Sequence, residues 1–342
     1  MAVLYATSFE GGSVAYMILA GWTGSNLAIH SGTRVHRTLA GVGGSFAMDI
    51  TGAGVLTRTP VFSTTSRWFH TYFAPQDADT PATAVFVFER SGAFTFTVRI
   101  NPTGTIELIR GDTAGTVVAT SAGVINRGVP HWLAIQLLAA DAAGTCEVWS
   151  DGVLVVSFTG DTKAHTTLAN WDQVRLVASG FSADHTIDDV IVTDSTTGRV
   201  VEHVAPVMVV DGVSSGNLTG VPVTGANRYQ NVDEGGANGA TSQTDYNQAV
   251  AVNDEDIYTL SDPPTPTSVL CAVFWAEAAR SGGITQAEIR VESGATTVSG
   301  PVEVLPASDY EANFYIRETD PDTAAAWTAA GLNAAKAGIK FT

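Results

Sequence analysis

The chain has 342 residues, 45% of them hydrophobic, which is enough to bury more than one core. Its 34 acidic residues outnumber its 17 basic ones and give a formal net charge of −17. An acidic surface repels nucleic-acid phosphates and anionic membranes, so neither is expected as a partner. The 34 glycines, together with frequent threonine and valine, are typical of an all-β protein with many turns.

The amino-terminal stretch predicts short strands and no export signal. Strands are predicted at residues 1–9, 14–20, 27–30, 45–50 and 55–59. The opening MAVLYATSFEGG has neither a basic region nor a long apolar region, so we expect synthesis in the cytoplasm without a signal peptide. A nearby cluster of basic side chains is expected to occupy ordinary loop positions rather than a metal or anion site. Its members are His30, Arg34, His36 and Arg37.

An aromatic-rich stretch, SRWFHTYF at residues 66–73, predicts a strand. Alternation places Trp68, His70 and Tyr72 on one face. That face either packs in the core of a sandwich or forms a stacking platform for a sugar, because aromatic rings offer flat apolar area with a polar edge. Trp149 and Trp171 are further candidates for glycan or partner contact, and core packing is the alternative for them too.

A polar loop is predicted at residues 76–81. Its Asp77 and Asp79 would supply only part of a Ca²⁺ site, which needs about six to eight oxygen ligands. We therefore expect no cofactor and no metal site, with a structural Ca²⁺ as the alternative that no specific motif supports.

From residue 84 onward the strand pattern becomes regular. Strands are predicted at 84–89, 94–100, 105–110, 117–119, 133–138, 146–149, 153–158, 173–177 and 187–192, with a type I turn at 101–104. Asp151-Gly152 between two apolar runs predicts a tight hairpin, because a type I′ turn needs positive φ at both central residues. Short strands in such number, separated by turn residues, favour a two-sheet antiparallel sandwich or jelly roll.

Four segments carry a resemblance to a known superfamily. In order they read PHWLAIQLL, CEVWSDGVLVVSFTGDT, NWDQVRLVASG and HTIDDVIV, between residues 130 and 192. Residues 1–200 as a whole resemble the sandwiches of concanavalin A-like and laminin-G-like lectins. That superfamily includes lectins, glycosidases, adhesive modules and bacteriophage virion proteins, so the resemblance implies a fold rather than an activity.

The catalytic members of that superfamily carry a Glu-x-Asp-x-x-Glu type of run on one strand, because glycoside hydrolysis uses two carboxylates. This chain has no such run. Asp188 and Asp189 are the nearest candidates, and adjacent residues of a regular strand point to opposite faces. The sequence therefore predicts no catalytic residues and a protein that is not an enzyme.

A second module is predicted after a boundary near residue 200. The division reads 1–200 for the lectin-like sandwich, 201–230 for a transition segment and 231–342 for a β-rich module. The apolar run at 268–279 predicts a buried strand, with a helix as the alternative, and strands at 286–291, 295–298 and 313–316 complete a small β-sandwich. Cys146 and Cys271 are expected as buried free thiols, with a disulfide as the alternative.

The segment from YQNVDE to the end resembles a carboxy-terminal β-module of bacteriophage virion proteins. Its last part, RETDPDTAAAWTAAGLNAAKAGIKF, predicts a helix over 324–335 capped by Thr323, with Gly338 just past its end, and a terminal strand at 339–341.

The two resemblances together imply a non-enzymatic bacteriophage virion protein, such as a capsid-surface, neck or tail fibre or spike component. Its expected partners are other copies of the chain (a trimer is favoured), other virion proteins and host surface polysaccharide. The alternative is a carbohydrate-binding adhesin or receptor-binding module, and a glycoside hydrolase comes third.

Overall fold

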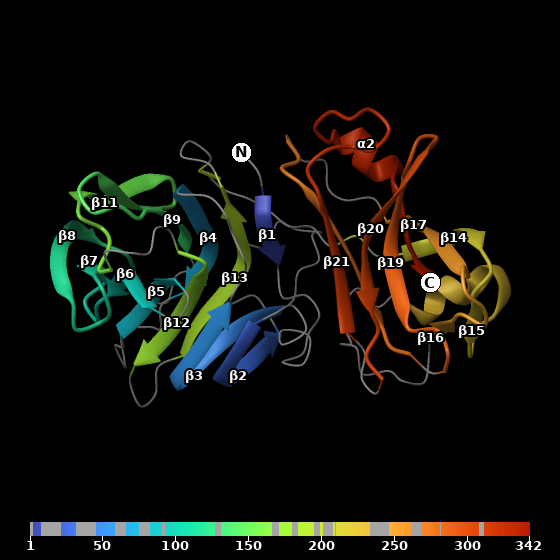
Figure 1. Ribbon diagram of the computed structural model, residues 1–342, viewed down its shortest axis with the longest axis horizontal. Coiled ribbons are helices and arrows are strands. Elements are labelled where there is room, and N and C mark those ends of the chain that lie inside the picture. Colours follow the sequence, from blue (N-terminus) through green and yellow to red (C-terminus); the bar gives the residue numbers. More distant parts are fainter. Residues whose placement is uncertain are drawn as a thin grey trace. The chain divides into compact units, whose positions relative to one another are not determined.

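The computed structural model shows an all-β protein that divides into two compact units (Figure 1). Unit 1 contains the described residues up to Val200, and unit 2 contains those from Met208 onward. The structure describes residues 3–7, 22–31, 46–58, 66–74, 83–90, 93–126, 131–165, 171–179, 184–194, 199–200, 208, 210–232, 246–261, 268–280, 282–307 and 311–342.

Thirteen described strands build unit 1. They are β1 (Val3–Thr7), β2 (Trp22–Ser31), β3 (Phe46–Arg58), β4 (Ser66–Ala74), β5 (Thr83–Arg90), β6 (Ala93–Ile100), β7 (Thr105–Arg110), β8 (Thr116–Val124), β9 (His131–Leu138), β10 (Gly144–Ser150), β11 (Val153–Gly160), β12 (Gln173–Ser179) and β13 (Asp184–Thr193). All the pairings between them are antiparallel.

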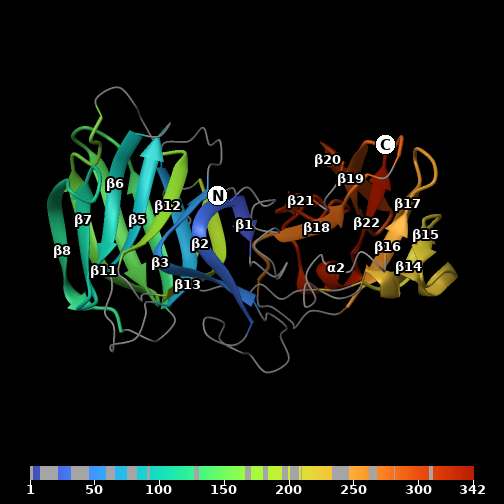
Figure 2. The same cartoon turned by 90° about the horizontal axis from the view of Figure 1, so that it is seen from below.

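Unit 1 has two layers joined through a long strand. The first sheet has the order β11-β10-β9-β4-β13. The second has the order β12-β5-β6-β7-β8, which can be followed in Figure 2. Strand β3 belongs to both, because its residues 48–51 pair with β13 and its residues 55–58 pair with β12. Strand β2 pairs with β3, and β1 pairs with β13.

Aromatic side chains from both sheets fill the space between them. Phe69 and Phe73 of β4 project from the first sheet and contact Phe86 of the second, with ring centroids 6.0 and 5.4 Å apart. Phe88 of β5 contacts Phe69 edge-on at 6.4 Å. All four rings are buried, so this cluster is the core of unit 1.

The predicted Asp-Gly hairpin is confirmed between β10 and β11. Asp151 has φ of 50° and Gly152 has φ of 82°, as a type I′ turn requires. The Asp151 carboxylate also accepts a hydrogen bond from the backbone N–H of Trp132 at 3.0 Å and contacts Nδ1 of His131 at 2.5 Å. One turn residue therefore fixes the hairpin to the start of the neighbouring β9.

Unit 2 is a smaller sandwich made from shorter elements. They are β14 (Val210–Gly216), β15 (Thr219–Val221), the 3₁₀ helix η1 (Gly225–Asn231), β16 (Tyr246–Gln248), β17 (Glu255–Leu260), β18 (Ala272–Ala278), β19 (Gln286–Ser293), β20 (Thr296–Val304), β21 (Glu311–Arg317), α2 (Ala329–Ala334) and β22 (Lys336–Phe341). A five-stranded sheet has the order β14-β17-β22-β19-β20, and β18-β21 and β15-β16 form two-stranded ladders.

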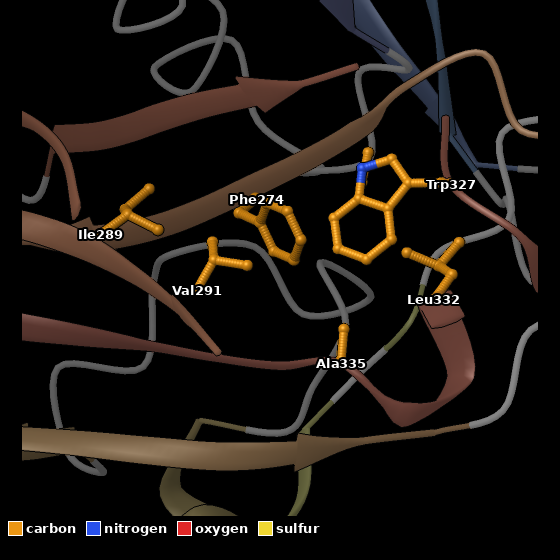
Figure 3. Packing of buried hydrophobic residues seen from close by; sticks show 7 residues of the cluster. Phe274, Ile289, Val291, Trp327, Leu332 and Ala335 are labelled. Atoms are coloured by element: carbon orange, nitrogen blue, oxygen red, sulfur yellow. The ribbon is translucent and has the colours of Figure 1, made fainter. Parts of the chain in front are cut away.

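The core of unit 2 lies between the five-stranded sheet and the β18-β21 ladder. Phe274 of β18 packs on Trp327 with ring centroids 6.3 Å apart, and Ile289 and Val291 of β19 lie beside them (Figure 3). The buried indole N–H of Trp327 donates to the Arg317 carbonyl at 3.0 Å. The run at 268–279 thus contains a strand, as predicted, and not the alternative helix.

The predicted helix over 324–335 is corrected by the structure. Helix α2 covers only Ala329–Ala334, and its N-cap is Thr328, whose hydroxyl accepts from the Gly331 N–H at 2.9 Å. The helix does not extend to earlier residues because Thr328 is extended, with φ of −97° and ψ of 158°, and Ala324 has φ of 56°, outside the right-handed helical region. Gly338 lies within β22, where an added Cβ would come 1.9 Å from the Asp256 carbonyl oxygen.

A buried ion pair links two elements of unit 2. Arg228 of η1 donates to both carboxylate oxygens of Asp256, through Nε at 2.6 Å and Nη2 at 2.5 Å. The carboxylate also accepts from the Leu218 N–H and from the Tyr258 hydroxyl, at 3.1 and 2.9 Å. Hydrogen bonding to Asp256 raises the pKa of Arg228, and burial raises the pKa of Tyr258. This network connects η1 and the start of β15 to β17.

A carboxylate in the turn before β17 makes unit 2 sensitive to acid. Asp254 accepts hydrogen bonds from the backbone N–H groups of Val250 and Ala251, both at 2.8 Å, and from the Asn217 amide at 2.7 Å. The two backbone bonds hold the pKa of Asp254 below its usual value. Because the folded pKa is lower than the unfolded one, this stabilisation is present above about pH 4 and disappears as the pH falls through the folded pKa.

We expect the Asp254→Asn variant to be less stable than the unchanged protein at pH 7 and to lose less stability on acidification. Urea unfolding of the unit 2 transition between pH 7 and pH 3 measures this difference. Parallel losses in the two proteins over that range would contradict it.

The cysteines are both free, Cys146 in unit 1 and Cys271 in unit 2. Burial raises the pKa of Cys271 to about 12 and that of the Cys146 thiol well above its usual range. Neither thiol is therefore activated as a nucleophile at neutral pH.

Candidate functional site

The outer face of the first sheet, opposite the core, collects a row of aromatic side chains. Near-parallel rings of Trp68, His70 and Trp132 follow one another at centroid distances of 5.9 Å, with interplanar angles of 18° and 15°. Tyr72 packs on Trp132 at 4.9 Å. We call these four residues the aromatic row. It forms because alternation on β4 and β9 directs all four side chains to this face.

Two residues after β13 cross over the aromatic row. Arg199 and Val200 are both partly exposed, and we call them the strap. The Val200 N–H donates to Nε2 of His70 at 3.0 Å, and the Val200 carbonyl accepts from the indole N–H of Trp132 at 2.8 Å. The Val200 peptide groups therefore satisfy the acceptor on His70 and the donor on Trp132.

These contacts determine the tautomer of His70. Its Nε2 accepts from Val200, so this atom carries no proton, and its Nδ1 lies 3.2 Å from the carbonyl of Ile191, to which it donates. The imidazole is neutral and fully buried. Its Nε2 is an acceptor directed towards the strap.

The outer face remains accessible beside the row, over β10 and β11. Thr145, Glu147 and Trp149 of β10 are partly exposed, and the residues paired with them on β11 are exposed. Those β11 partners are Thr159, Ser157 and Leu154 respectively. We call these six residues the open face. It offers one indole ring, one carboxylate and three hydroxyl groups to a ligand.

Trp149 is fixed in position by polar neighbours. Its indole N–H donates to Glu147 at 2.9 Å, and the guanidinium carbon of Arg199 lies 3.9 Å from the ring centroid. This distance is that of a cation–π contact. Because the ring is held before any ligand arrives, little side-chain entropy would be lost on binding.

The structure locates the five residues singled out from the sequence in different environments. Trp68, His70 and Tyr72 do share one face, and all three are buried beneath the outer surface. Trp171 is buried in the interior, where its ring lies 4.9 Å from that of Phe88. Trp149 is the member of the set that is partly exposed. Whether any of them contacts a glycan stays a prediction.

Sequence reasoning did not find Glu147, the strap or the hydroxyl groups of β11. Glu147 was detectable in principle, since it lies two positions before Trp149 on a predicted strand and so shares its face. Nothing in the sequence places Val200 over His70, because that contact joins residues 130 positions apart.

The described part of the chain contains no group of three or more His, Cys, Asp or Glu side chains that could hold a metal ion. Asp77, Asp79, Arg34, His36 and Arg37 lie outside it, and of His30 it describes only the backbone, on β2, so the predictions about these residues stay predictions. None of the described helices is long and apolar enough to cross a membrane.

Comparison with known proteins gives structural likeness only. No protein-family model matches the sequence, and no curated protein sequence is detectably similar. One similar solved structure is an endo-β-1,4-glucuronan lyase from the fungus Trichoderma reesei, with 14% identity, a TM-score of 0.43 and coverage of 57% of this chain and 96% of the lyase. A carbohydrate esterase of the Shiga toxin-encoding bacteriophage phi24B has 14% identity, a TM-score of 0.40 and coverage of 57% and 99%.

A third similar structure is the carbohydrate recognition domain of Emp46p, with 12% identity, a TM-score of 0.37 and coverage of 56% of this chain and 99% of that domain. At these identities the likeness concerns the fold alone. The prediction of an all-β protein with a two-sheet antiparallel sandwich is confirmed.

The prediction that the protein is not an enzyme is overturned by these findings. The similar solved structures include a lyase and an esterase. The pairing of β13 with β4 shifts register between Asp188 and Ile191. The Asp188 and Asp189 side chains lie outside what the structure describes, so the expectation that they point to opposite faces stays a prediction.

Proposed function

We propose that unit 1 is a carbohydrate-recognition domain and that its open face binds the saccharide. The observation that carries this proposal is Trp149, a partly exposed indole held in place by Glu147 and Arg199 in the middle of a polar strand surface. A pyranose ring has an apolar face of C–H groups and an equatorial rim of hydroxyls. An aromatic plane bordered by hydrogen-bonding side chains is complementary to both.

The neighbouring side chains supply the polar part of this recognition. Glu147 accepts hydrogen bonds from sugar hydroxyls, and the Ser157 and Thr159 hydroxyls both donate and accept. Leu154 extends the apolar area beside the indole, since it pairs with Trp149 across the ladder and is 43% exposed. Because the open face has a single indole ring, we expect recognition of one or two sugar units with modest affinity.

We expect Trp149→Ala to weaken saccharide binding by about 30-fold, since truncation of a contacting aromatic side chain removes ~2 kcal/mol of apolar burial. A glycan array with the intact protein identifies the ligand, and isothermal titration compares the variants. Trp149→Phe should retain part of the affinity because it keeps a flat ring.

The matched control is Val124→Ala on β8, a side chain that is 57% exposed and lies on the second sheet. It should bind like the unchanged protein. Absence of any glycan ligand, or equal affinity of the Trp149→Ala variant, would refute the proposal.

We further propose that the whole chain is a bacteriophage virion protein that displays this domain in several copies, a trimer being favoured. The support comes from the resemblance of both sequence modules to virion proteins and from the net charge of −17, which keeps crowded copies soluble. Display in several copies would raise the avidity of a weak site for a host polysaccharide. Native mass spectrometry of the purified protein and mass spectrometry of purified particles test the copy number and the location. A monomer absent from particles would refute this part.

A further inference from the structure

We propose that the strap occupies a second saccharide subsite and competes with the ligand for it. In this proposal the ligand-binding surface continues from the open face beneath Arg199 and Val200 onto the aromatic row. It rests on the proposed carbohydrate recognition and adds to that site a second part, the aromatic row, which the strap covers.

The hydrogen bonds of the strap are of the kind that a sugar hydroxyl makes. His70 offers an acceptor at Nε2 and Trp132 offers a donor at Nε1, and the peptide groups of Val200 satisfy both. One hydroxyl, or two adjacent ones, can donate to the first atom and accept from the second. Because Ile191 determines the tautomer of His70, these two positions persist when the strap leaves.

An unsatisfied donor lies further along the same row. The indole Nε1 of Trp68 is buried and has no hydrogen-bond partner among the residues that the structure describes. The Trp68 side chain is 3% exposed and its ring stacks on that of His70. A buried N–H without a partner is unfavourable, so a ligand oxygen at this position would gain a hydrogen bond that the strap does not make.

The open face and the aromatic row are neighbouring parts of one surface. Trp149 pairs with Ala134 of β9, and Ala134 pairs on its other side with His70. The small Ala134 separates the two rings without a large side chain between them. Arg199 lies on the Trp149 ring and Val200 bonds to His70, so these two consecutive residues contact both parts of the surface.

The test uses a change that removes one strap hydrogen bond. Val200→Pro deletes the N–H that His70 accepts and restricts Arg199 to extended conformations, whereas the control Val200→Ala keeps both backbone bonds. We expect Val200→Pro to bind the saccharide about tenfold more tightly than Val200→Ala, because the ligand no longer displaces a fully bonded strap. Adding Trp132→Phe, which removes the indole donor, should abolish the gain.

A measurement on the unchanged protein keeps the proposal falsifiable if Val200→Pro fails to fold. At saturating saccharide the Val200 amide should exchange its hydrogen faster than in the free protein, because its acceptor is taken by the ligand. Unchanged or slower exchange would overturn the proposal. A Val200→Pro variant that binds the saccharide no better than Val200→Ala would also overturn it. So would a gain in affinity that remains when Trp132→Phe is added.

Failure of the open-face proposal is recognisable separately. If the unchanged protein binds no glycan but Val200→Pro binds one in a Trp132-dependent manner, the strap proposal holds and the open face is not the site. If Val200→Pro also binds none on the same array, both proposals fail.

Discussion

Replacing Asp256 with alanine should destabilise unit 2 by about 3–5 kcal/mol, because it leaves the Arg228 guanidinium buried without its counter-ion. Arg228 and Asp256 are both buried, and the substitution also removes the acceptor of the Leu218 N–H and of the Tyr258 hydroxyl. Urea unfolding followed by circular dichroism should show the unit 2 transition at a lower midpoint. The unit 1 transition should stay where it is.

The control for this prediction removes both charges at once. A double variant, Arg228→Met with Asp256→Leu, should recover much of the loss, since two apolar side chains of similar volume leave no buried charge. Asp211→Asn changes an exposed carboxylate that accepts from the Thr259 hydroxyl, and it should shift stability by less than about 0.5 kcal/mol. A single Asp256→Ala variant as stable as the Asp211 variant would show that the ion pair contributes little.

In unit 1, Phe69→Ala should destabilise the sandwich by about 3–5 kcal/mol, the usual range for truncating a buried phenylalanine. Phe69 is fully buried on β4, a strand bonded on both sides, and its ring contacts Phe86 and Phe88 of the opposite sheet. Removing it opens a cavity between the sheets and breaks two aromatic contacts. Thermal unfolding by calorimetry should show a lower transition for unit 1 alone.

Two comparison variants separate the cavity from other effects. Phe69→Leu keeps most of the volume and should lose clearly less stability than Phe69→Ala. Val153→Ala changes a side chain that is 66% exposed beside the Asp151 hairpin and should be nearly neutral. Equal losses for Phe69→Ala and Val153→Ala would place the core of unit 1 elsewhere.

The fold of unit 1 was predictable because its signals are local. Alternation marks the strands, and the Asp-Gly pair at 151–152 determines its own turn, as the positive φ values show. The carboxy-terminal helix was predicted too long because that prediction, too, used only local signals. The alanine run favours a helix, but the turn around Asp320 and the left-handed Ala324 interrupt it, and that turn forms through contacts with its neighbours.

The candidate site was predictable only in part, because burial is a tertiary property. Strand alternation correctly placed Trp68, His70 and Tyr72 on one face, but it left open whether that face is buried in the core or available to a ligand. The Val200 peptide groups bond to that face from 130 positions away in the sequence. A pattern of period two cannot contain this information, which depends on the path that the chain takes after its last strand.

The pairing of β1 with β13 has a mechanical consequence. Val3 lies opposite Thr193, and Thr7 lies opposite Val190, so the two strands that begin and end the described sandwich have their outer ends side by side. A pulling force applied between residue 3 and residue 193 would load the ladder bonds one after another, as a zipper opens, rather than all at once in shear. Along this direction unit 1 should yield at low force, by peeling β1 away before the rest of the sandwich is stretched.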